Sequence, residues 1–269
     1  MKKNSKLLDI LAFVVIGLFL ILPLFMTVVY SFFRDFTKII PREFTFDFYR
    51  ELFTATEIWP VLIRTVLISV LPVLITVMIM LLALYAARVY YPKAEVIMDA
   101  VSKIPYGIQG VIMAVSLIVL YGNSENFYGN RIFLLVCSYC VLICPYMYQG
   151  VKNTLTAIDM TPMLEAAEIL GASSLRTFVT IIVPAAYRGL LATMLLSAGL
   201  LFADFVLVNI LAGSYYETLG IFLNRMLSVS GPTAAAISTI MSVVMLALSA
   251  LVNHLNARQS SPQNGSQEN

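Results

Sequence analysis

Charge is scarce in this sequence. Only 12% of its 269 residues are charged and 60% are apolar, whereas a soluble globular domain has about 25% charged and about 45–50% apolar residues. The mean hydropathy of +0.88 agrees with this imbalance. The 17 Lys and Arg and the 15 Asp and Glu residues leave a net charge of +2 and are scattered along the chain. A soluble domain, and a nucleic-acid-binding protein with its concentrated basic face, are therefore excluded. We expect an integral membrane protein.

Residues that carry chemistry are few as well. There is one histidine, His254, and the three cysteines Cys137, Cys140 and Cys144 share one apolar stretch. No disulfide framework follows from them, and buried free cysteines usually behave as small hydrophobic residues, so we favour packing over a soft-metal site. The motifs H-E-x-x-H, G-x-S-x-G and the phosphate-binding G-x-x-x-x-G-K-[ST] do not occur. We therefore predict that the chain is not an enzyme and binds no catalytic metal or nucleotide.

Six apolar stretches are long enough to cross a bilayer, because a spanning helix needs about 20 mostly apolar residues. The predicted spans are residues 10–33, 61–87, 100–121, 132–151, 185–211 and 229–252, flanked by residues 1–9 and a tail at 253–269 whose polar end favours disorder. The first stretch is too long for the apolar part of a signal peptide and lacks a small-residue cleavage site. We predict one all-α transmembrane domain over residues 10–252 that retains its first span.

The distribution of basic residues predicts the orientation of these spans. With both termini in the cytoplasm, ten Lys and Arg residues lie inside and seven outside, four of them in a long outer loop at 34–60. This positive-inside bias favours cytoplasmic termini. Within the outer loop, aromatic and charged residues alternate from Asp47 to Phe53, which is typical of a short helix at the membrane surface. Trp59 is expected at the same level.

The inner loop between the fourth and fifth predicted spans, residues 159–184, contains two short helical patterns. Thr161 is a candidate cap for the first helix, Pro162 suits its first turn, and Gly171 favours a left-handed stop at its end. A serine pair at 173–174 is expected to cap the second helix. The first helix carries a small apolar stripe, formed by Met163, Ala166, Ala167 and Leu170. A helix this short is not stable alone, so the stripe indicates a protein partner.

Ten residues of this loop form a recognisable pattern. They are Glu165, Ala166, Ala167, Leu170, Gly171, Ala172, Ser173, Phe178, Ile181 and Pro184. In residues and gaps the loop resembles the EAA loop of binding-protein-dependent ABC importer permeases, although Val183 replaces the usual Leu and Arg188 a second proline. The resemblance is nearly end to end. The segments at 44–52 and 196–215 resemble the outer segment and fifth span of the spermidine/putrescine branch, whereas Arg64-Thr65 replaces that branch's Asn-Ser.

The resemblance implies a type I ABC importer permease fold in the bacterial inner membrane, with six transmembrane helices and cytoplasmic coupling helices. It also implies the partners: two ABC ATPase subunits, a second permease subunit that forms a heterodimer with this chain, and an extracytoplasmic solute-binding protein. ATP and Mg²⁺ would then bind the ATPase subunits, and this chain would hold no cofactor. The residues implied to couple to the ATPase are Glu165, Ala166, Ala167, Leu170, Gly171, Ala172, Ser173 and Pro184.

Polar residues inside the predicted spans are candidates for the solute path. Asp204 is the only acid in the central apolar run of a span, where an ionised side chain is costly. It either lines the path, where it would suit a cation, or makes a structural or partner hydrogen bond, and Asn209 shares these alternatives. Prolines bend helices toward cavities, so polar residues that follow prolines in the third and fourth spans are further candidates: Gln109, Tyr146 and Gln149.

The branch of the resemblance favours spermidine or putrescine as the substrate. Related branches carry ferric iron, thiamine or phosphonates, and the external binding protein supplies much of the selectivity, so these substrates remain alternatives. A secondary transporter is the alternative of a different class, since six spans and an intramembrane acid would suit it too. Such carriers usually show several intramembrane charges and an internal repeat, and neither is clear in this sequence.

Overall fold

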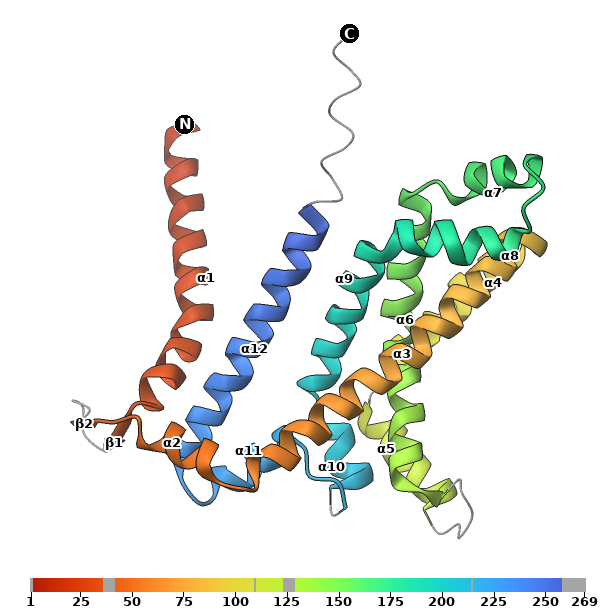
Figure 1. Ribbon diagram of the computed structural model, residues 1–269. Helices are drawn as coiled ribbons and strands as arrows, with labels where there is room; N and C mark the ends of the chain where they lie inside the picture. Colours follow the sequence, from red (N-terminus) through yellow and green to blue (C-terminus); the bar gives the residue numbers. More distant parts are fainter. Residues whose placement is uncertain (1, 36–41, 109, 123–128, 214, 258–269) are drawn as a thin grey trace. The chain divides into compact units, whose positions relative to one another are not determined.

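The computed structural model describes residues 2–35, 42–108, 110–122, 129–213 and 215–257, most of which are helical (Figure 1). The α-helices in chain order are α1 (Lys2–Tyr30), α2 (Asp47–Thr54), α3 (Ile58–Tyr90), α4 (Ala94–Val101), α5 (Gly110–Tyr121), α6 (Arg131–Ala157), α7 (Met160–Ile169), α8 (Ser174–Thr177), α9 (Val183–Phe202), α10 (Val206–Ala212), α11 (Leu219–Leu227) and α12 (Gly231–Ala257). Two three-residue strands, β1 (Phe33–Asp35) and β2 (Arg42–Phe44), pair antiparallel. The predicted all-α class is confirmed.

Within the described residues, five helices are long and apolar enough to cross a membrane, and a sixth span results if one bent helix pair counts as a single crossing. The five are Ile10–Tyr30, Ile58–Tyr90, Arg131–Ala157, Ser174–Phe202 and Gly231–Leu255, and the bent pair is Ala94–Gly107 with Gly110–Tyr121. Each overlaps one of the six predicted spans. The third and fifth, however, differ from the prediction in shape and boundaries.

The third span, predicted over residues 100–121, is not one straight helix. α4 ends at Val101, the 3-10 turn η1 (Ile104–Gly107) follows, and α5 begins at Gly110. Pro105 lies in the first turn of η1, where its missing N–H and its ring prevent a regular helix from continuing through it. The predicted start, residue 100, falls near the end of α4 because that helix carries Glu95 and Asp99, which lower its hydropathy.

The fifth span, predicted over residues 185–211, begins earlier and is interrupted. One apolar helical run extends from Ser174 to Phe202, and α10 begins only at Val206. The prediction starts just after Pro184, but this proline lies in the first turn of α9, directly behind the π-helical segment η3 (Phe178–Ile182). A π turn rearranges the backbone hydrogen bonds, which accommodates the missing N–H of proline.

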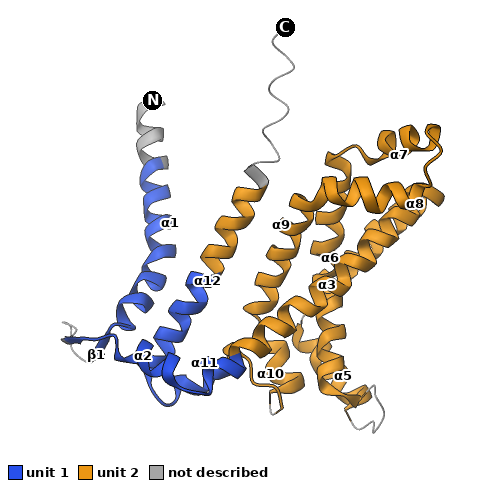
Figure 2. Ribbon diagram, in the orientation of Figure 1, with its two compact units in different colours: residues 1–61, 222–244 blue, residues 62–221, 245–269 orange. Residues whose placement is uncertain are grey.

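The chain divides into two compact units, residues 1–61 with 222–244 and residues 62–221 with 245–269 (Figure 2). The second unit holds a large hydrophobic core. Its completely buried members include Leu84, Ala114, Leu135, Tyr139, Met147, Val151, Leu155, Ile182 and Ala186. Five of these nine lie on α6, so α6 is the central helix of this unit. The next helix, α7, therefore follows a helix that is well packed in the core.

The first unit joins α1 to α2 through aromatic rings. The ring of Phe32 stacks on those of Phe44 and Tyr49, at centroid distances of 5.7 and 5.2 Å. The hydroxyls of Ser31 and Tyr49 are hydrogen-bonded at 2.7 Å. Helix α2, at Asp47–Thr54, confirms the predicted short helix of the outer loop and buries one residue, Leu52.

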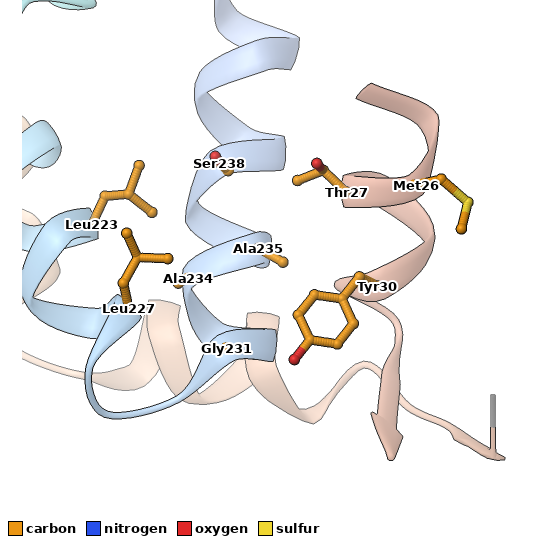
Figure 3. Close-up of a pocket in the computed structure, with 9 residues that line it drawn as sticks. All are labelled: Met26, Thr27, Tyr30, Leu223, Leu227, Gly231, Ala234, Ala235 and Ser238. Carbon is orange, nitrogen blue, oxygen red and sulfur yellow. The ribbon is translucent and has the colours of Figure 1, made fainter. Parts of the chain in front are cut away.

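A cavity of about 620 Å³ lies between α1, α11 and α12 in the first unit (Figure 3). On α12 it is lined by small residues, Gly231, Ala234, Ala235 and Ser238, and on the other helices by Met26, Thr27, Tyr30, Leu223 and Leu227. The most apolar window of the α1 span has no buried residue in the described structure. The side chains of this window are therefore exposed, as suits contact with lipid or another subunit.

Gly150 allows α6 and α9 to approach closely. A β-carbon at this position would collide with the side chain of Thr193 on α9. We therefore expect Gly150→Val to lower the free energy of unfolding by about 1–3 kcal/mol, the usual cost of overpacking a core, measured as a loss of thermal stability in detergent. Gly17→Val is the matched control, because a β-carbon there meets no atom within 4 Å. Equal stability of the two variants would contradict this packing.

Candidate functional site

Helix α7 begins directly behind the core helix α6. Asp159 precedes it in the left-handed region, with φ of 54°, and makes no side-chain capping hydrogen bond. The prediction that Thr161 caps this helix is wrong, because the helix already starts at Met160 and Thr161 lies inside its first turn. Pro162 lies in that first turn as predicted, where no backbone N–H is required. The buried Met160 side chain anchors the start of α7 in the core.

Gly171 ends α7 as predicted, with a positive φ of 79°. The N–H of Gly171 donates to the carbonyl of Glu168 at 2.9 Å, and the N–H of Ala172 donates to that of Ala167 at 3.0 Å. These two bonds form a Schellman motif, which satisfies the last carbonyls of a helix and requires a left-handed residue, usually glycine. The chain therefore leaves α7 in a defined direction.

The two faces of α7 differ sharply. Met160 and Ala167 are buried and Leu164 is half-buried against the core. Of the predicted stripe, Ala167 thus points inward instead of outward, because the inward face follows the spacing 160, 164, 167. The other three members, Met163, Ala166 and Leu170, are exposed, as is Glu165. Ile169 and Leu170 are 86% and 87% exposed, so the tip of α7 presents two large free apolar side chains.

The turn after α7 is closed by a second contact. Ser173 occupies the N-cap position of α8 with an extended backbone but makes no side-chain capping bond. Instead, the Ser174 hydroxyl donates to the Glu168 carboxylate at 3.1 Å. Pro184, further along in α9, is exposed. The loop at 159–184 is therefore an ordered helix–turn–helix rather than a loose connection.

Asp204 lies at the break between α9 and α10. Its carboxylate oxygen Oδ2 accepts a hydrogen bond from the hydroxyl of Tyr139 at 2.9 Å and one from the backbone N–H of Leu207 at 3.2 Å. Tyr139 is completely buried in α6, whereas Asp204 is half-buried. The structural hydrogen bond, one of the two predicted alternatives, is thus present. Tyr139 was missed because a lone tyrosine in an apolar span carries no sequence signal of its partner.

The other polar candidates do not gather around Asp204. Asn209 is exposed on α10, and Tyr146 and Gln149 are exposed on α6. The side-chain amide of Gln149 donates to Asn153 at 3.2 Å, and the ring of Tyr146 packs edge-on against Tyr106 at 5.4 Å. These residues therefore offer polar surface on two helices instead of one closed site.

Gln109, the remaining candidate, lies outside the described residues.

The three cysteines are free thiols. No group of three or more His, Cys, Asp or Glu residues in the described part of the chain could hold a metal ion, and Cys140 and Cys144 line an apolar cavity of about 340 Å³. Their surroundings suit packing residues.

Comparison with known proteins places these features in a family. The family model described as "Binding-protein-dependent transport system inner membrane component" matches residues 66–261. The spermidine/putrescine transport system permease protein PotC of Haemophilus influenzae is 27% identical, covering 87% of this chain and 90% of that protein. The corresponding PotB of Salmonella typhimurium is 26% identical, covering 91% and 92%. A bacterial ABC transporter involved in the import of the acidic polysaccharide alginate has a chain with a TM-score of 0.68 at 17% identity, covering 96% of both chains.

Proposed function

Because this chain belongs to the family of binding-protein-dependent transport system inner membrane components, it is a permease subunit of an ABC importer, and we propose that it carries a polyamine of the spermidine and putrescine class. Two relatives that align along most of its length are named as spermidine/putrescine permeases, which supports this substrate. Their identity is 26–27%. Ferric iron, thiamine and phosphonates are the substrates against which the proposal is tested.

The exposed apolar tip of α7 supports a proposal for how ATP hydrolysis is coupled to transport. Ile169 and Leu170 are almost fully exposed on a helix whose other face is anchored in the core. A short helix that presents apolar side chains in this way suits a groove on a partner protein. We infer that the ATPase subunit docks here, with Met163 and Ala166 completing the contact and Glu165 at its edge. Ala167 is buried, so we assign it to holding α7 against the core instead of to the contact with the ATPase.

The geometry after α7 supports transmission of force. The Schellman motif at Gly171 and the bond from Ser174 to Glu168 tie α7 to α8, and α8 continues through η3 into the fifth span. Ala172 and Ser173 form the tight connection, and Pro184 lies where the run becomes α-helical. ATP-driven closure of two ATPase subunits would therefore move α7, α8 and α9 together. ATP and Mg²⁺ belong to those subunits, and this chain contributes no catalytic group.

The remaining partners follow from the proposed assembly. A second permease subunit would complete the pathway as a heterodimer, and an extracytoplasmic solute-binding protein would deliver the solute. If the bent pair counts as one crossing, four spans of the described residues precede α7 and two follow it, so a cytoplasmic α7 would put both termini in the cytoplasm. The exposed polar residues Tyr146, Gln149 and Asn209 would line the interface or the path between the permease subunits, together with Asp204 and Gln109.

Reconstitution into vesicles tests the proposed substrate. The four kinds of subunit are assembled, and uptake of labelled spermidine is measured with and without ATP inside the vesicle. We expect uptake that requires ATP and the binding protein and that putrescine competes away. Uptake of iron, thiamine or a phosphonate in place of spermidine would refute the polyamine assignment. Uptake by this chain alone, driven by an ion gradient, would refute the importer mechanism and favour a carrier.

A further inference from the structure

Ion pairs join three helices of the second unit at a place that the proposed function does not use. Arg88 lies near the end of α3, Glu95 and Asp99 on α4, and Lys152 on α6. The Glu95 carboxylate lies 3.6 Å from Arg88 Nε and 3.3 Å from Lys152 Nζ, and Lys152 Nζ also lies 3.5 Å from Asp99. These four residues are called the α3–α4–α6 charge cluster.

Two hydrogen bonds with uncharged groups reinforce the charge cluster. The Arg88 guanidinium donates to the Thr156 hydroxyl at 2.8 Å, and the Tyr148 hydroxyl donates to the backbone carbonyl of Glu95 at 3.1 Å. The four charged side chains are only 15–33% exposed. Ion pairs at fully exposed positions contribute little because water and salt screen them, whereas these pairs are partly shielded.

Helix α4 depends on these contacts. None of its eight residues is buried, so hydrophobic packing alone does not hold it in place. Its two acidic side chains contact α3 and α6. Glu95 also lies in the first turn, where the positive end of the helix dipole stabilises its negative charge. The charge cluster therefore attaches α4 to α3 and α6, in addition to the packing of the partly buried Met98 against the core.

The charge cluster also lies beside the start of α7. Arg88 and Glu95 line a cavity of about 430 Å³ together with Thr156, Asp159, Met160 and Thr161. Lys152 precedes the end of α6 by about one and a half turns, and α7 begins three residues after that end. On the other side, α4 leads through η1 into α5, the bent pair of the third span. The cluster thus lies between the start of α7 and the bent third span: Lys152 is on α6, which leads into α7, and Glu95 and Asp99 are on α4, which leads into the bend.

We propose that the α3–α4–α6 charge cluster is a strut that carries the movement of α7 to α4, and so to the bend before α5. The proposal rests on the proposed docking of the ATPase on α7. Rigid elements joined by charged contacts transmit movement without themselves binding nucleotide or solute. Removal of the strut leaves α7 able to dock while the third span no longer follows it.

A double-mutant cycle on the assembled complex tests the strut. We expect Glu95→Gln and Lys152→Met each to lower the spermidine taken up per ATP hydrolysed by about fivefold or more. The loss in the double variant should be smaller than the two single losses combined, because Glu95 and Lys152 share one ion pair. Asp47→Asn, which removes the exposed Arg34–Asp47 pair in the first unit, is the control and should leave the ratio unchanged. Full coupling in Glu95→Gln, or additive losses in the double variant, would overturn the proposal.

A second measurement does not depend on the substrate. Spin labels are placed on Val96→Cys and Thr161→Cys in a complex whose native cysteines are replaced. The distribution of distances between the two labels should be narrow both with and without ATP. It should become broader when Glu95→Gln is added. An unchanged distribution in that variant would overturn the strut. Lack of spermidine uptake by the wild-type complex refutes the substrate alone, and lack of ATPase copurification refutes docking, so the three failures are distinct.

Discussion

Replacement of Gly171 by arginine is expected to lower uptake roughly thirtyfold or more while the protein remains in the membrane. Gly171 has φ of 79°, where most residues other than glycine and asparagine cost about 1–2 kcal/mol. The long charged side chain would also stand beside the exposed Leu170 at the tip of α7. Loss of a central contact in an interface costs about 2 kcal/mol or more, which corresponds to the expected loss. Uptake in vesicles and copurification of the ATPase measure the effect.

Gly171→Asn is the matched control for this variant. Asparagine tolerates the left-handed region better than other residues with a side chain, and a β-carbon at position 171 would meet no atom within 4 Å. We expect this variant to retain the ATPase and most of the uptake. Normal uptake by Gly171→Arg would contradict docking at the tip of α7, whereas loss of the arginine variant from the membrane would indicate a folding defect instead.

Two substitutions of Asp204 are expected to separate its structural role from its role in transport. Asp204→Ala leaves the buried hydroxyl of Tyr139 without an acceptor and removes the bond to the N–H of Leu207. Loss of a buried hydrogen-bond partner costs about 1–3 kcal/mol, so we expect lower thermal stability and loss of the assembled complex. Stability in detergent and subunit recovery measure this effect.

Asp204→Asn keeps an oxygen that accepts from Tyr139 and removes only the charge. If Asp204 lines the path of a polycation, as we propose, this variant should assemble but take up spermidine about tenfold more slowly, a loss of roughly 1.4 kcal/mol in transition-state stabilisation. Tyr139→Phe, which removes the bond but leaves the carboxylate, is the companion variant and should lose stability rather than selectivity. Unchanged uptake by an assembled Asp204→Asn complex would assign Asp204 to structure alone.

The features of α7 that local chemistry controls were predictable. Its left-handed end at Gly171 follows from the backbone freedom of glycine, and Pro162 lies in the first turn because that turn requires no N–H. The inward position of Ala167 was not predictable, since Met163, Ala166, Ala167 and Leu170 are equally apolar or small. The core around Met160 and Leu164 decides which side of the helix turns inward.

The same distinction applies to the membrane spans: their approximate positions were predictable from the sequence, whereas their interruptions were not. Apolar length predicts six crossings because the bilayer requires about 20 apolar residues of each, but it cannot place the ends of a helix that carries charges. Glu95 and Asp99 lower the hydropathy of α4, yet Lys152, far along the chain, neutralises them in space. Hydropathy counts these charges as water-exposed, whereas the structure pairs them.

The sequence by itself determined that this is a membrane protein, where its six apolar spans approximately lie and which turn ends α7. These properties depend on composition over about 20 residues or on the conformational freedom of a single residue. Only the tertiary structure decided which side of α7 is free, which tyrosine meets Asp204 and which charges hold α4. Two of these depend on pairs more than 50 positions apart, Tyr139 with Asp204 and Glu95 with Lys152, and local sequence patterns do not predict such pairs.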